Sequence, residues 1–461
     1  MSTTSLASGP EGPHALRPLL DTVLQALDEG AHARGGPLPA GGPAAVAARL
    51  RAALGDVLPQ HGDPHALHTL VHALAAGAAD PADPLCAAHL HCPPLAVATA
   101  ADLAASVLNP SLDSWDQAPA ASELETLVTR ALAAEIYAGA ATPPSPDALI
   151  TTGGTESNQL ALLLARETHG TGLRLICGAN AHHSLPRAAW LLGLPDPVTI
   201  PAPTGTLDPA ALDKALTTLP GPHLVAATAG TTDAGLIDPL PEIAALCTAH
   251  HARLHIDAAY GGGLLLSDRH RNKLTGLGHA HTITLDLHKL GWQPVAAGLL
   301  AVRDAHDLTA LDQHADYLNA DDDTEAGLPD LLGRSLRTTR RPDILKIAVT
   351  LKTLGRTGLG ALVDQVCERA QEFAALVSSH PGFELHDRPT ISTVLFRPAH
   401  TTDEAVAAVR RKLLHQGRAV LGRAPLDGRL WLKATLLNPE TRPDDLATLL
   451  ALVEKAADDP A

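Results

Sequence analysis

From about residue 148 onward, short apolar runs alternate with longer stretches whose apolar residues have helical spacing. The apolar runs include "ALITT", "LRLICGA", "HLVAATA", "ARLHI", "HTITLDL" and "AAGLLAV". Between them, apolar residues recur roughly every three to four positions, as in a helix that buries one face. This alternation predicts a largely parallel sheet that is covered by helices on both faces.

The same pattern predicts three parts in the chain. Residues 1–95 are a helical segment, interrupted by the breaker-rich stretch "GGPLPAGGP" at 35–43. Residues 96–345 carry the alternation of apolar runs and helices and are expected to form a large α/β domain. Residues 346–461 begin with a helix and later contain the strand-like "RLWLKATLL". They are expected to form a smaller C-terminal α/β domain.

Polar residues follow the carboxyl ends of the successive predicted strands. Ligands of open α/β sheets bind outside these strand ends. Five polar ends in succession are difficult to attribute to chance, so we expect them to form one site. In chain order, the strand ends carry Gly153-Gly154-Thr155, His182-His183, Thr231-Thr232, Asp257 and His288-Lys289.

Lys289 directly follows the apolar run "HTITLDLH". A lysine is costly to bury unless its charge is paired or neutralised. It is therefore either a side chain that reaches solvent by its long stem or a nucleophile held in the site. Two rival lysines are less suited: the alternation around Lys433 predicts a half-exposed strand, and Lys273 lies in a polar loop.

The residue types at the strand ends match the requirements of pyridoxal phosphate. Gly153, Gly154 and Thr155 open a helix, where free amides and the helix dipole form an anion site. A plain glycine turn with Thr155 as the N-cap is an equally good interpretation of this stretch alone. The cofactor also requires a lysine for a Schiff base and a carboxylate opposite its pyridinium nitrogen. Lys289 and Asp257 can meet these two needs.

These residues lie in motifs that resemble the group II pyridoxal-phosphate-dependent amino-acid decarboxylases. The motifs are "ITTGGTESNQLALL", "AHHSLPRAA", "TAGTTDAGLIDP", "HIDAAYGGG" and "DLHKLGWQP", and the match extends from about residue 80 to the C-terminus. Within the family, "CAAHLHCPP", "SLRTTRRPDILK" and "LKATLLNP" are most similar to L-2,4-diaminobutyrate decarboxylases. The resemblance implies the type I, aspartate aminotransferase-like fold. It also implies an obligate homodimer whose N-terminal helices pack on the partner subunit.

The resemblance further implies a role for each site residue. Lys289 would bind the cofactor as a Schiff base, and Asp257 would pair with its pyridinium nitrogen. This complete set, with a histidine stacked on the ring, argues against a non-catalytic protein on the same fold. The other implied contacts are His182 stacked on the ring, Ala259 under it, His288 before the lysine, Thr231 beside the cofactor, and Gly154 and Thr155 around the phosphate.

The implied reaction is loss of the carboxylate of an L-amino acid as carbon dioxide, which leaves the amine. A mobile loop in the family often supplies a tyrosine that protonates the carbanion. A gapless comparison places Leu331 at or near that position, and the chain contains only the tyrosines Tyr137, Tyr260 and Tyr317. Either another group, such as His182, delivers the proton, or the carbanion meets oxygen and yields an aldehyde.

Composition narrows the remaining classes of partner and location. The net charge of −16 argues against nucleic acid or an anionic membrane as partner. Five scattered cysteines, none in CxxC spacing, predict reduced thiols and a cytoplasmic location. No signal peptide or membrane-spanning run is recognised. The "HLHC" stretch has no paired ligands elsewhere, so no metal is expected.

Several charged residues leave two interpretations open. Asp113 and Asp116 could hold the distal ammonium of a basic diamino acid, or they could be turn and cap carboxylates. Arg340 and Arg341 could attract the substrate carboxylate or anchor the joint between domains. The acidic run Asp321–Asp323 is expected to be a solvated loop.

Overall fold

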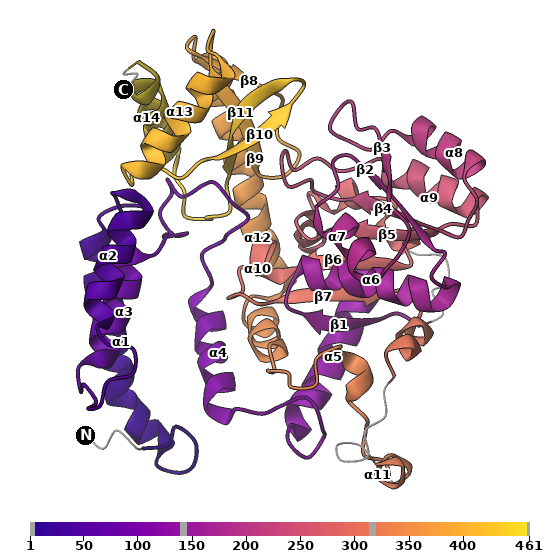
Figure 1. Ribbon diagram of the computed structural model, residues 1–461, viewed down its shortest axis with the longest axis horizontal. Coiled ribbons are helices and arrows are strands. Elements are labelled where there is room, and N and C mark those ends of the chain that lie inside the picture. The colour runs from indigo at the N-terminus through magenta and orange to yellow at the C-terminus, as the bar shows by residue number, and fades with distance from the viewer. Residues whose placement is uncertain (1–4, 139–144, 313–319, 459–461) are drawn as a thin grey trace. The chain divides into compact units, whose positions relative to one another are not determined.

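The computed structural model describes residues 5–138, 145–312 and 320–458. The described residues form two compact units. The larger unit comprises Pro94–Glu368 and Pro389–Thr393. The smaller unit comprises the described residues of Met1–Pro93, Arg369–Arg388 and Val394–Ala461. Helix α12 (Ile344–Ser379) contributes residues to both (Figure 1).

The larger unit is built on a seven-stranded sheet with the order β1-β7-β6-β5-β4-β2-β3. β7 is antiparallel to both of its neighbours, whereas the pairs from β6 to β3 are parallel. The mainly parallel α/β fold predicted from the sequence is therefore confirmed. The strands are β1 (Asp147–Thr151), β2 (Arg174–Gly178), β3 (Val198–Ile200), β4 (His223–Thr228), β5 (Arg253–Asp257), β6 (Thr282–Asp286) and β7 (Gly298–Val302).

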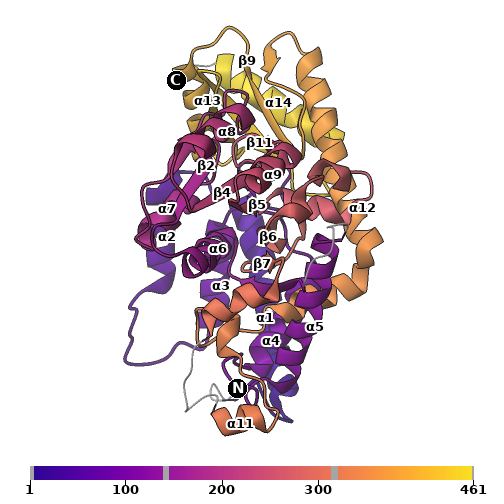
Figure 2. The same cartoon turned by 90° about the vertical axis from the view of Figure 1, so that its right-hand side faces the viewer.

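Five strands of the sheet are buried along their whole length, including the polar residues that they carry. Every residue of β1, β4, β5, β6 and β7 is buried, so both faces of the sheet are covered. α6 (Gly154–His169) packs on β5, β6 and β7, and α9 (Leu240–Ala249) packs on β4 and β5 (Figures 1 and 2). Leucine and alanine side chains fill the interfaces of α6 with the sheet.

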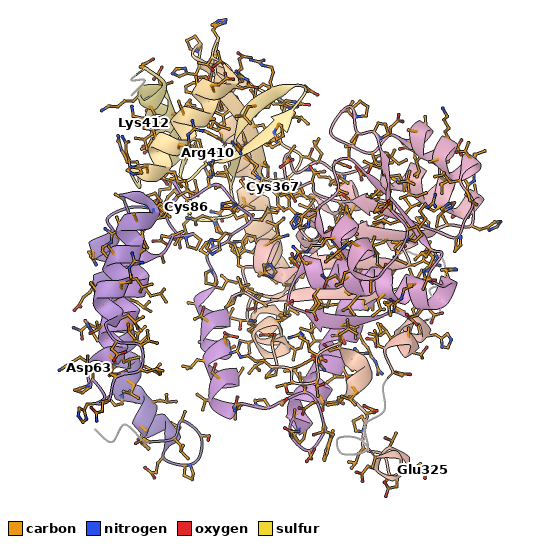
Figure 3. All side chains as sticks on the ribbon, in the orientation of Figure 1. Asp63, Cys86, Glu325, Cys367, Arg410 and Lys412 are labelled. Atoms are coloured by element: carbon orange, nitrogen blue, oxygen red, sulfur yellow. The ribbon has the colours of Figure 1, made fainter. Side chains whose placement is uncertain are left out.

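The other helices of the larger unit precede, connect or follow the strands. The acidic run at 321–323 opens a five-residue helix, so the expectation of a loop was wrong; Glu325 ends this helix (Figure 3). The remaining α-helices are α4 (Ala96–Leu108), α5 (Pro119–Ile136), α7 (Ser184–Leu191), α8 (Pro209–Thr218), α10 (Leu287–Leu290) and α11 (Asp321–Glu325). The 3-10 helices are η1 (Gly261–Leu266), η2 (Arg271–Leu274), η3 (Leu277–His279), η4 (Ala305–Leu311) and η5 (Leu332–Arg334).

The smaller unit contains a four-stranded sheet with the order β10-β11-β9-β8. Phe373, Phe383 and Phe396 meet in its core. The N-terminal chain joins this unit through backbone hydrogen bonds such as that from the Thr435 amide to the Ala87 carbonyl (2.7 Å). Its elements are α1 (Gly12–Arg34), α2 (Gly42–Leu54), α3 (Ala66–Gly77), β8 (Phe383–Leu385), β9 (Thr393–Pro398), α13 (Asp403–His415), β10 (Gly422–Leu426), β11 (Arg429–Thr435) and α14 (Pro443–Asp458).

Lys433 differs from its expected half-exposed position. Only 7% of its surface is accessible, and the chain at Ala88 lies on the same face, 2.8 Å from the position of a Cβ added to Gly422. Its stem lies over Gly422 of β10, where an added Cβ would come within 2.7 Å of the Lys433 Cε. The alternation of apolar and polar residues along β11 predicted that the face carrying Lys433 would be exposed. In the structure, neighbouring chain covers this face.

No helix within the described ranges is both long enough and apolar enough to cross a membrane.

Candidate active site

The predicted site residues follow strand ends that meet at one edge of the large sheet. β1, β2, β4, β5 and β6 all run in the same direction, so their carboxyl ends share this edge. In register, Thr228 of β4 lies beside Asp257 of β5, and Asp257 lies beside Thr284 of β6. The edge therefore collects side chains that are far apart in the sequence, as the strand pattern predicted.

Lys289 lies on α10, the single helical turn that follows β6. Its Nζ is 2.9 Å from Oδ2 of Asp286, and the exposed fractions of the two side chains are 18% and 3%. The lysine is thus mostly buried and is paired with a carboxylate, which compensates part of the cost of burying its charge. His288 also approaches this carboxylate, with its Nε2 3.6 Å from Asp286 Oδ2. Burial lowers the pKa of His288, against the opposing effect of Asp286.

Asp257 is held in place by two hydrogen bonds. The side-chain amide of Asn158 donates to its Oδ2 (2.7 Å), and the backbone amide of Ala259 donates to its Oδ1 (3.1 Å). Asn158 also accepts hydrogen bonds at its Oδ1 from Thr284 Oγ1 and from His255 Nε2, each at 2.9 Å. Burial lowers the pKa of His255 to about 4, so this imidazole is neutral at physiological pH. The Asp257 carboxylate therefore has a fixed direction.

His182 is connected to Asp257 through the same asparagine. Asn158 Nδ2 donates to Ser184 Oγ (2.9 Å), which lies 2.8 Å from Nδ1 of His182. The backbone amide of Ser184 also donates to this Nδ1 (3.3 Å). Since a backbone amide can only donate, Nδ1 is an acceptor and the proton of the neutral imidazole lies on Nε2.

The electrostatic surroundings of His182 show which charges lie near it. Burial lowers its pKa; Asp257 and Asp286 oppose this shift, while His183 and Lys289 reinforce it. The His183 ring lies beside it, with ring centroids 4.1 Å apart and planes at 49°. The lysine, the carboxylate and the histidine that the sequence predicted are thus brought into one site.

The glycine turn before α6 forms a close-fitting cradle. Gly153 has φ +145°, and an added Cβ on Gly298 of β7 would lie 2.5 Å from the Gly153 Cα. An added Cβ on Gly154 would lie 3.0 Å from the Cβ of Ala259 and 3.2 Å from Oδ2 of Asp286. Amides of the first helical turn, including those of Gly154 and Thr155, lack carbonyl partners within the helix. This donor set fits a phosphate group.

Thr231 is buried in the loop after β4, where its contacts are structural. Its Oγ1 accepts from the Leu236 amide (3.0 Å), and its own amide donates to the Leu236 carbonyl (2.8 Å). The loop adjoins the site, because the Ala229 amide donates to the Asp257 carbonyl (2.8 Å). A direct contact of Thr231 with the cofactor stays a prediction.

The two arginines of "TTRRP" are both engaged by carboxylates of the larger unit. Arg340 forms a buried ion pair with Glu125 (2.9 Å), and Arg341 contacts Asp102 (2.7 Å). These contacts favour a structural role over recruitment of the substrate carboxylate, but they lie within the larger unit and do not anchor a joint between domains. Within the described ranges, no three His, Cys, Asp or Glu side chains gather as a metal site.

The described tyrosines have hydrogen-bond partners away from the lysine. The hydroxyl of Tyr137 lies 3.3 Å from the His281 carbonyl, and that of Tyr260 lies 2.8 Å from Ser392 Oγ. Burial raises the pKa of Tyr260 to about 12. Leu331 is buried, and Tyr317 lies outside the described residues.

Sequence reasoning missed three residues of this site: Asn158, His255 and Asp286. Asn158 lies one helical turn after the glycine turn, and His255 lies two residues before Asp257 on the same strand face. Asp286 lies three residues before Lys289. The available signals were the spacings of these residues from residues already predicted, which are four positions for Asn158, two for His255 and three for Asp286.

Comparison with known proteins gives a consistent result. Residues 50–399 match the pyridoxal-dependent decarboxylase conserved domain. An L-2,4-diaminobutyrate decarboxylase of Rhizobium meliloti is 41% identical over 84% of this chain and 80% of its own length. An enzyme of the same name from Acinetobacter baumannii is 33% identical over 79% of this chain and 78% of its own length.

Solved structures agree with these sequence matches. The glutamate decarboxylase domain of a diaminobutyrate-pyruvate transaminase and L-2,4-diaminobutyrate decarboxylase from Vibrio parahaemolyticus has a TM-score of 0.86, is 31% identical, and aligns over 98% of this chain and 97% of that one. A Rhodiola rosea 4-hydroxyphenylacetaldehyde synthase has a TM-score of 0.82 at 19% identity, over 97% and 98% of the two chains, and shows the fold alone.

The site and the family agree about the cofactor. A lysine in a mostly buried site, a fixed carboxylate and a helix start lined by glycine are the groups that pyridoxal phosphate requires. The chain therefore belongs to the pyridoxal-dependent decarboxylase family and is a pyridoxal-phosphate-dependent amino-acid decarboxylase, a carboxy-lyase.

Proposed function

We propose that this enzyme decarboxylates a basic diamino acid, L-2,4-diaminobutyrate, to the diamine and carbon dioxide. The observation that supports this choice of substrate is the 41% identity, over 84% of the chain, to an enzyme named for this substrate. The reaction is supported by the ion-paired Lys289 and by His182, on which the charges of both Lys289 and Asp257 act.

Each site residue has a proposed role in this reaction. Pyridoxal phosphate, when bound, supplies a ring that accepts the electrons of the bond between Cα and the carboxylate. Lys289 binds the cofactor and gives way to the substrate amine. Asp257, fixed by Asn158 and the Ala259 amide, keeps a proton on the pyridinium nitrogen. The amides of Gly154 and Thr155 hold the phosphate, with His288 beside the lysine.

We assign the return of the proton to Cα to His182. Its Nδ1 accepts hydrogen bonds from Ser184, so Nε2 carries the proton that can be donated. The described tyrosines, Tyr137 and Tyr260, are bound elsewhere. A proton donor at the ring favours the amine, whereas a carbanion that waits for oxygen would yield the aldehyde.

For the distal ammonium of the substrate we propose Asp113 rather than Asp116. Asp113 is buried, with 8% of its surface accessible, whereas Asp116 accepts a hydrogen bond from Ser114 Oγ (2.6 Å) as a turn carboxylate does. Asp113→Asn should raise the KM for diaminobutyrate at least tenfold with little change for an uncharged amino acid. Asp116→Asn is the matched control. Equal KM changes for both kinds of substrate would contradict this assignment.

We also propose that the enzyme is a cytoplasmic homodimer, with residues 1–95 covering the partner subunit, 96–345 binding the cofactor and 346–461 forming the small domain. Exposed leucines on the N-terminal helices support a dimer, because they would lose contact with water there. Five free thiols support a reducing compartment. Light scattering of the full chain tests the dimer. The exposed leucines are Leu19, Leu24 and Leu27 on α1 and Leu67, Leu70 and Leu74 on α3.

The substrate proposal is tested by kcat/KM values for a panel of L-amino acids. The panel contains 2,4-diaminobutyrate, ornithine, lysine, glutamate and an aromatic amino acid. We expect the highest kcat/KM for diaminobutyrate. Preference for glutamate or an aromatic substrate would refute the diamino-acid proposal and leave the decarboxylase family intact.

A further inference from the structure

Asp286 is the carboxylate that contacts Lys289, and no role has been assigned to it above. It is the last residue of β6 and is almost fully buried. Its Oδ2 is 2.9 Å from Lys289 Nζ, and its buried Oδ1 accepts no hydrogen bond from any residue that the structure describes. A buried carboxylate with one unsatisfied oxygen is costly. The ion pair with Lys289 compensates this cost.

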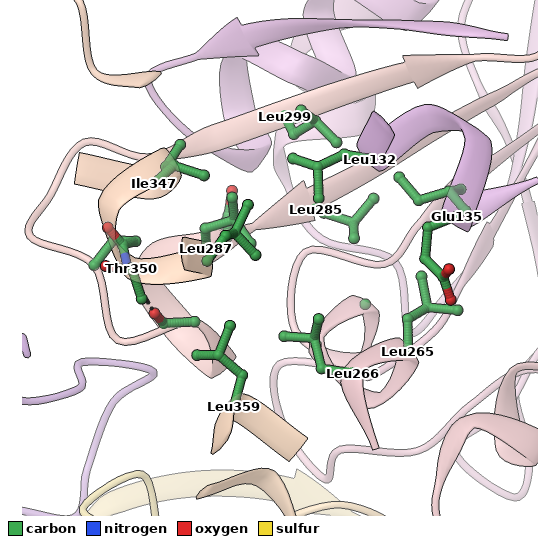
Figure 4. A pocket seen from close by; sticks show the side chains of 17 residues that line it. Leu132, Glu135, Leu265, Leu266, Leu285, Leu287, Leu299, Ile347, Thr350 and Leu359 are labelled. Atoms are coloured by element: carbon green, nitrogen blue, oxygen red, sulfur yellow. Dashed lines mark hydrogen bonds between the residues drawn. The ribbon is translucent and has the colours of Figure 1, made fainter. Parts of the chain in front are cut away.

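Part of the surroundings of Asp286 has low polarity. On one side lies the glycine turn, where an added Cβ on Gly154 would be 3.2 Å from Oδ2. On the other side Asp286 lines an apolar cavity of about 50 Å³, into which Leu285, Leu287 and Leu299 point (Figure 4). Low polarity strengthens the attraction between a carboxylate and a cation. The position of Asp286 therefore favours close pairing of its carboxylate with the lysine nitrogen.

Other titratable groups around the pair come from several elements. They act on the same site, so a valid test must leave all of them in place. They are His288 on the same segment, His182 before α7, with His183 and Asp257 acting on His182, and Lys346 on α12, which acts on His288.

We propose that Asp286 is the positioning residue and counter-ion of Lys289, an inference that rests on the proposed role of Lys289. With pyridoxal phosphate bound, exchange of Lys289 for the substrate amine would form the carbon–nitrogen linkage to the substrate and break the one to the lysine, with one proton passing from the substrate nitrogen to the lysine nitrogen. Asp286 would accept a hydrogen bond from the freed Lys289 amine and keep it beside the site until the product leaves.

The same carboxylate would act in the resting enzyme. There it would stabilise the positively charged, protonated form of the linkage that Lys289 makes to the cofactor. A merely structural carboxylate at the end of β6 would not affect that charge. The pH at which the visible absorption band of the loaded enzyme changes therefore distinguishes a counter-ion from a merely structural carboxylate.

The chain offers a close control for this experiment. Lys346 and Asp343 form a second buried pair with the same spacing of three residues and an Nζ–Oδ1 distance of 3.0 Å. Asp286→Asn and Asp343→Asn thus each remove one carboxylate from a buried lysine. Both variants are expected to lower the Tm, but only one of these lysines is proposed to bind the cofactor.

The test is a pH titration of the visible band in loaded wild-type enzyme, D286N and D343N, without substrate. We expect the midpoint in D286N to fall by at least about one pH unit, the lower range for loss of a close opposite charge. D343N should titrate like the wild type. In D286N kcat should also fall, because the freed amine is no longer held.

A second variant separates the loss of the charge from the effect of poor folding in D286N. Asp286→Glu retains the charge, and the adjacent cavity can accept one methylene group. It should restore a midpoint close to that of the wild type. A D286N midpoint within about 0.3 units of wild type, or the same shift in D343N, would overturn the inference. Wild-type protein without a visible band would instead refute the role of Lys289 and, with it, the role of Asp286.

Discussion

Replacement of Asn158 by leucine tests whether the site depends on one buried amide. Asn158 is fully buried on α6 and makes four side-chain hydrogen bonds, to Asp257, Ser184, His255 and Thr284. Leucine has a similar size and keeps the apolar packing, but it can neither donate nor accept. The substitution therefore removes the link between the proposed carboxylate and the proposed ring histidine.

The expected loss of stability follows from the hydrogen-bond partners of Asn158. Three of the bonds join neutral groups, each contributing about 0.5–1.5 kcal/mol, and the bond to Asp257 contributes about 1.5–3 kcal/mol. Since these contributions are not additive, we expect a loss of about 3–6 kcal/mol in the free energy of unfolding. We also expect kcat to fall at least about tenfold, because losing about 1.4 kcal/mol of transition-state stabilisation by Asp257 corresponds to a tenfold lower rate.

The assay combines urea unfolding with the dissociation constant for pyridoxal phosphate and the kcat. Ser157→Ala is the matched control, because Ser157 is a buried neighbour on α6 with one neutral bond, to Thr151 Oγ1 (2.7 Å). It should cost about 1 kcal/mol and retain cofactor binding. If Asn158→Leu retained wild-type kcat and cofactor affinity, the hydrogen-bond network would have no functional role and the reasoning would be refuted.

Three further predictions concern single residues. Lys289→Ala should lose both turnover and the visible band of the bound cofactor; full activity in a mass-verified variant would sink the assignment. Gly298→Ala should destabilise the protein by about 1–3 kcal/mol, because its Cβ would lie 2.5 Å from the Gly153 Cα; an unchanged Tm would show that the turn can move. The pKa of His255, lowered to about 4 by burial, means that the unfolded state binds more protons between pH 4 and about 6.5. Stability is therefore retained above this window, and about 3 kcal/mol of it is lost as pH falls through the window. The free energy of unfolding in urea should therefore depend on pH differently in wild type and in His255→Gln. The same pH dependence in both proteins would contradict His255 as the cause.

The sequence was sufficient to predict the sheet and the place of the site. Fully buried strands have continuous apolar runs, and polar residues at their carboxyl ends are easily recognised. Lys289, Asp257 and His182 were found in this way, and the structure brings them together. Their chemical roles stay predictions that the experiments above address.

Residues that act through other residues were not predictable in the same way. Asn158 and His255 lie on α6 and β5, and their hydrogen-bond partners come from other strands and helices. Only the tertiary arrangement shows that their polar atoms are satisfied. The expected exposure of Lys433 was wrong for a related reason, because alternation along β11 does not reveal that distant chain near Ala88 covers the face that carries this lysine.

The most direct test of the central claim is the stoichiometry of the reaction with L-2,4-diaminobutyrate. Carbon dioxide, diamine, aldehyde and oxygen uptake are followed together on enzyme loaded with pyridoxal phosphate, with Lys289→Ala as the blank. We predict one diamine for each carbon dioxide, without oxygen uptake, because His182 returns a proton to Cα. Aldehyde formed with oxygen uptake would contradict the proposed proton donor, and absence of carbon dioxide from every amino acid tested would contradict the account as a whole.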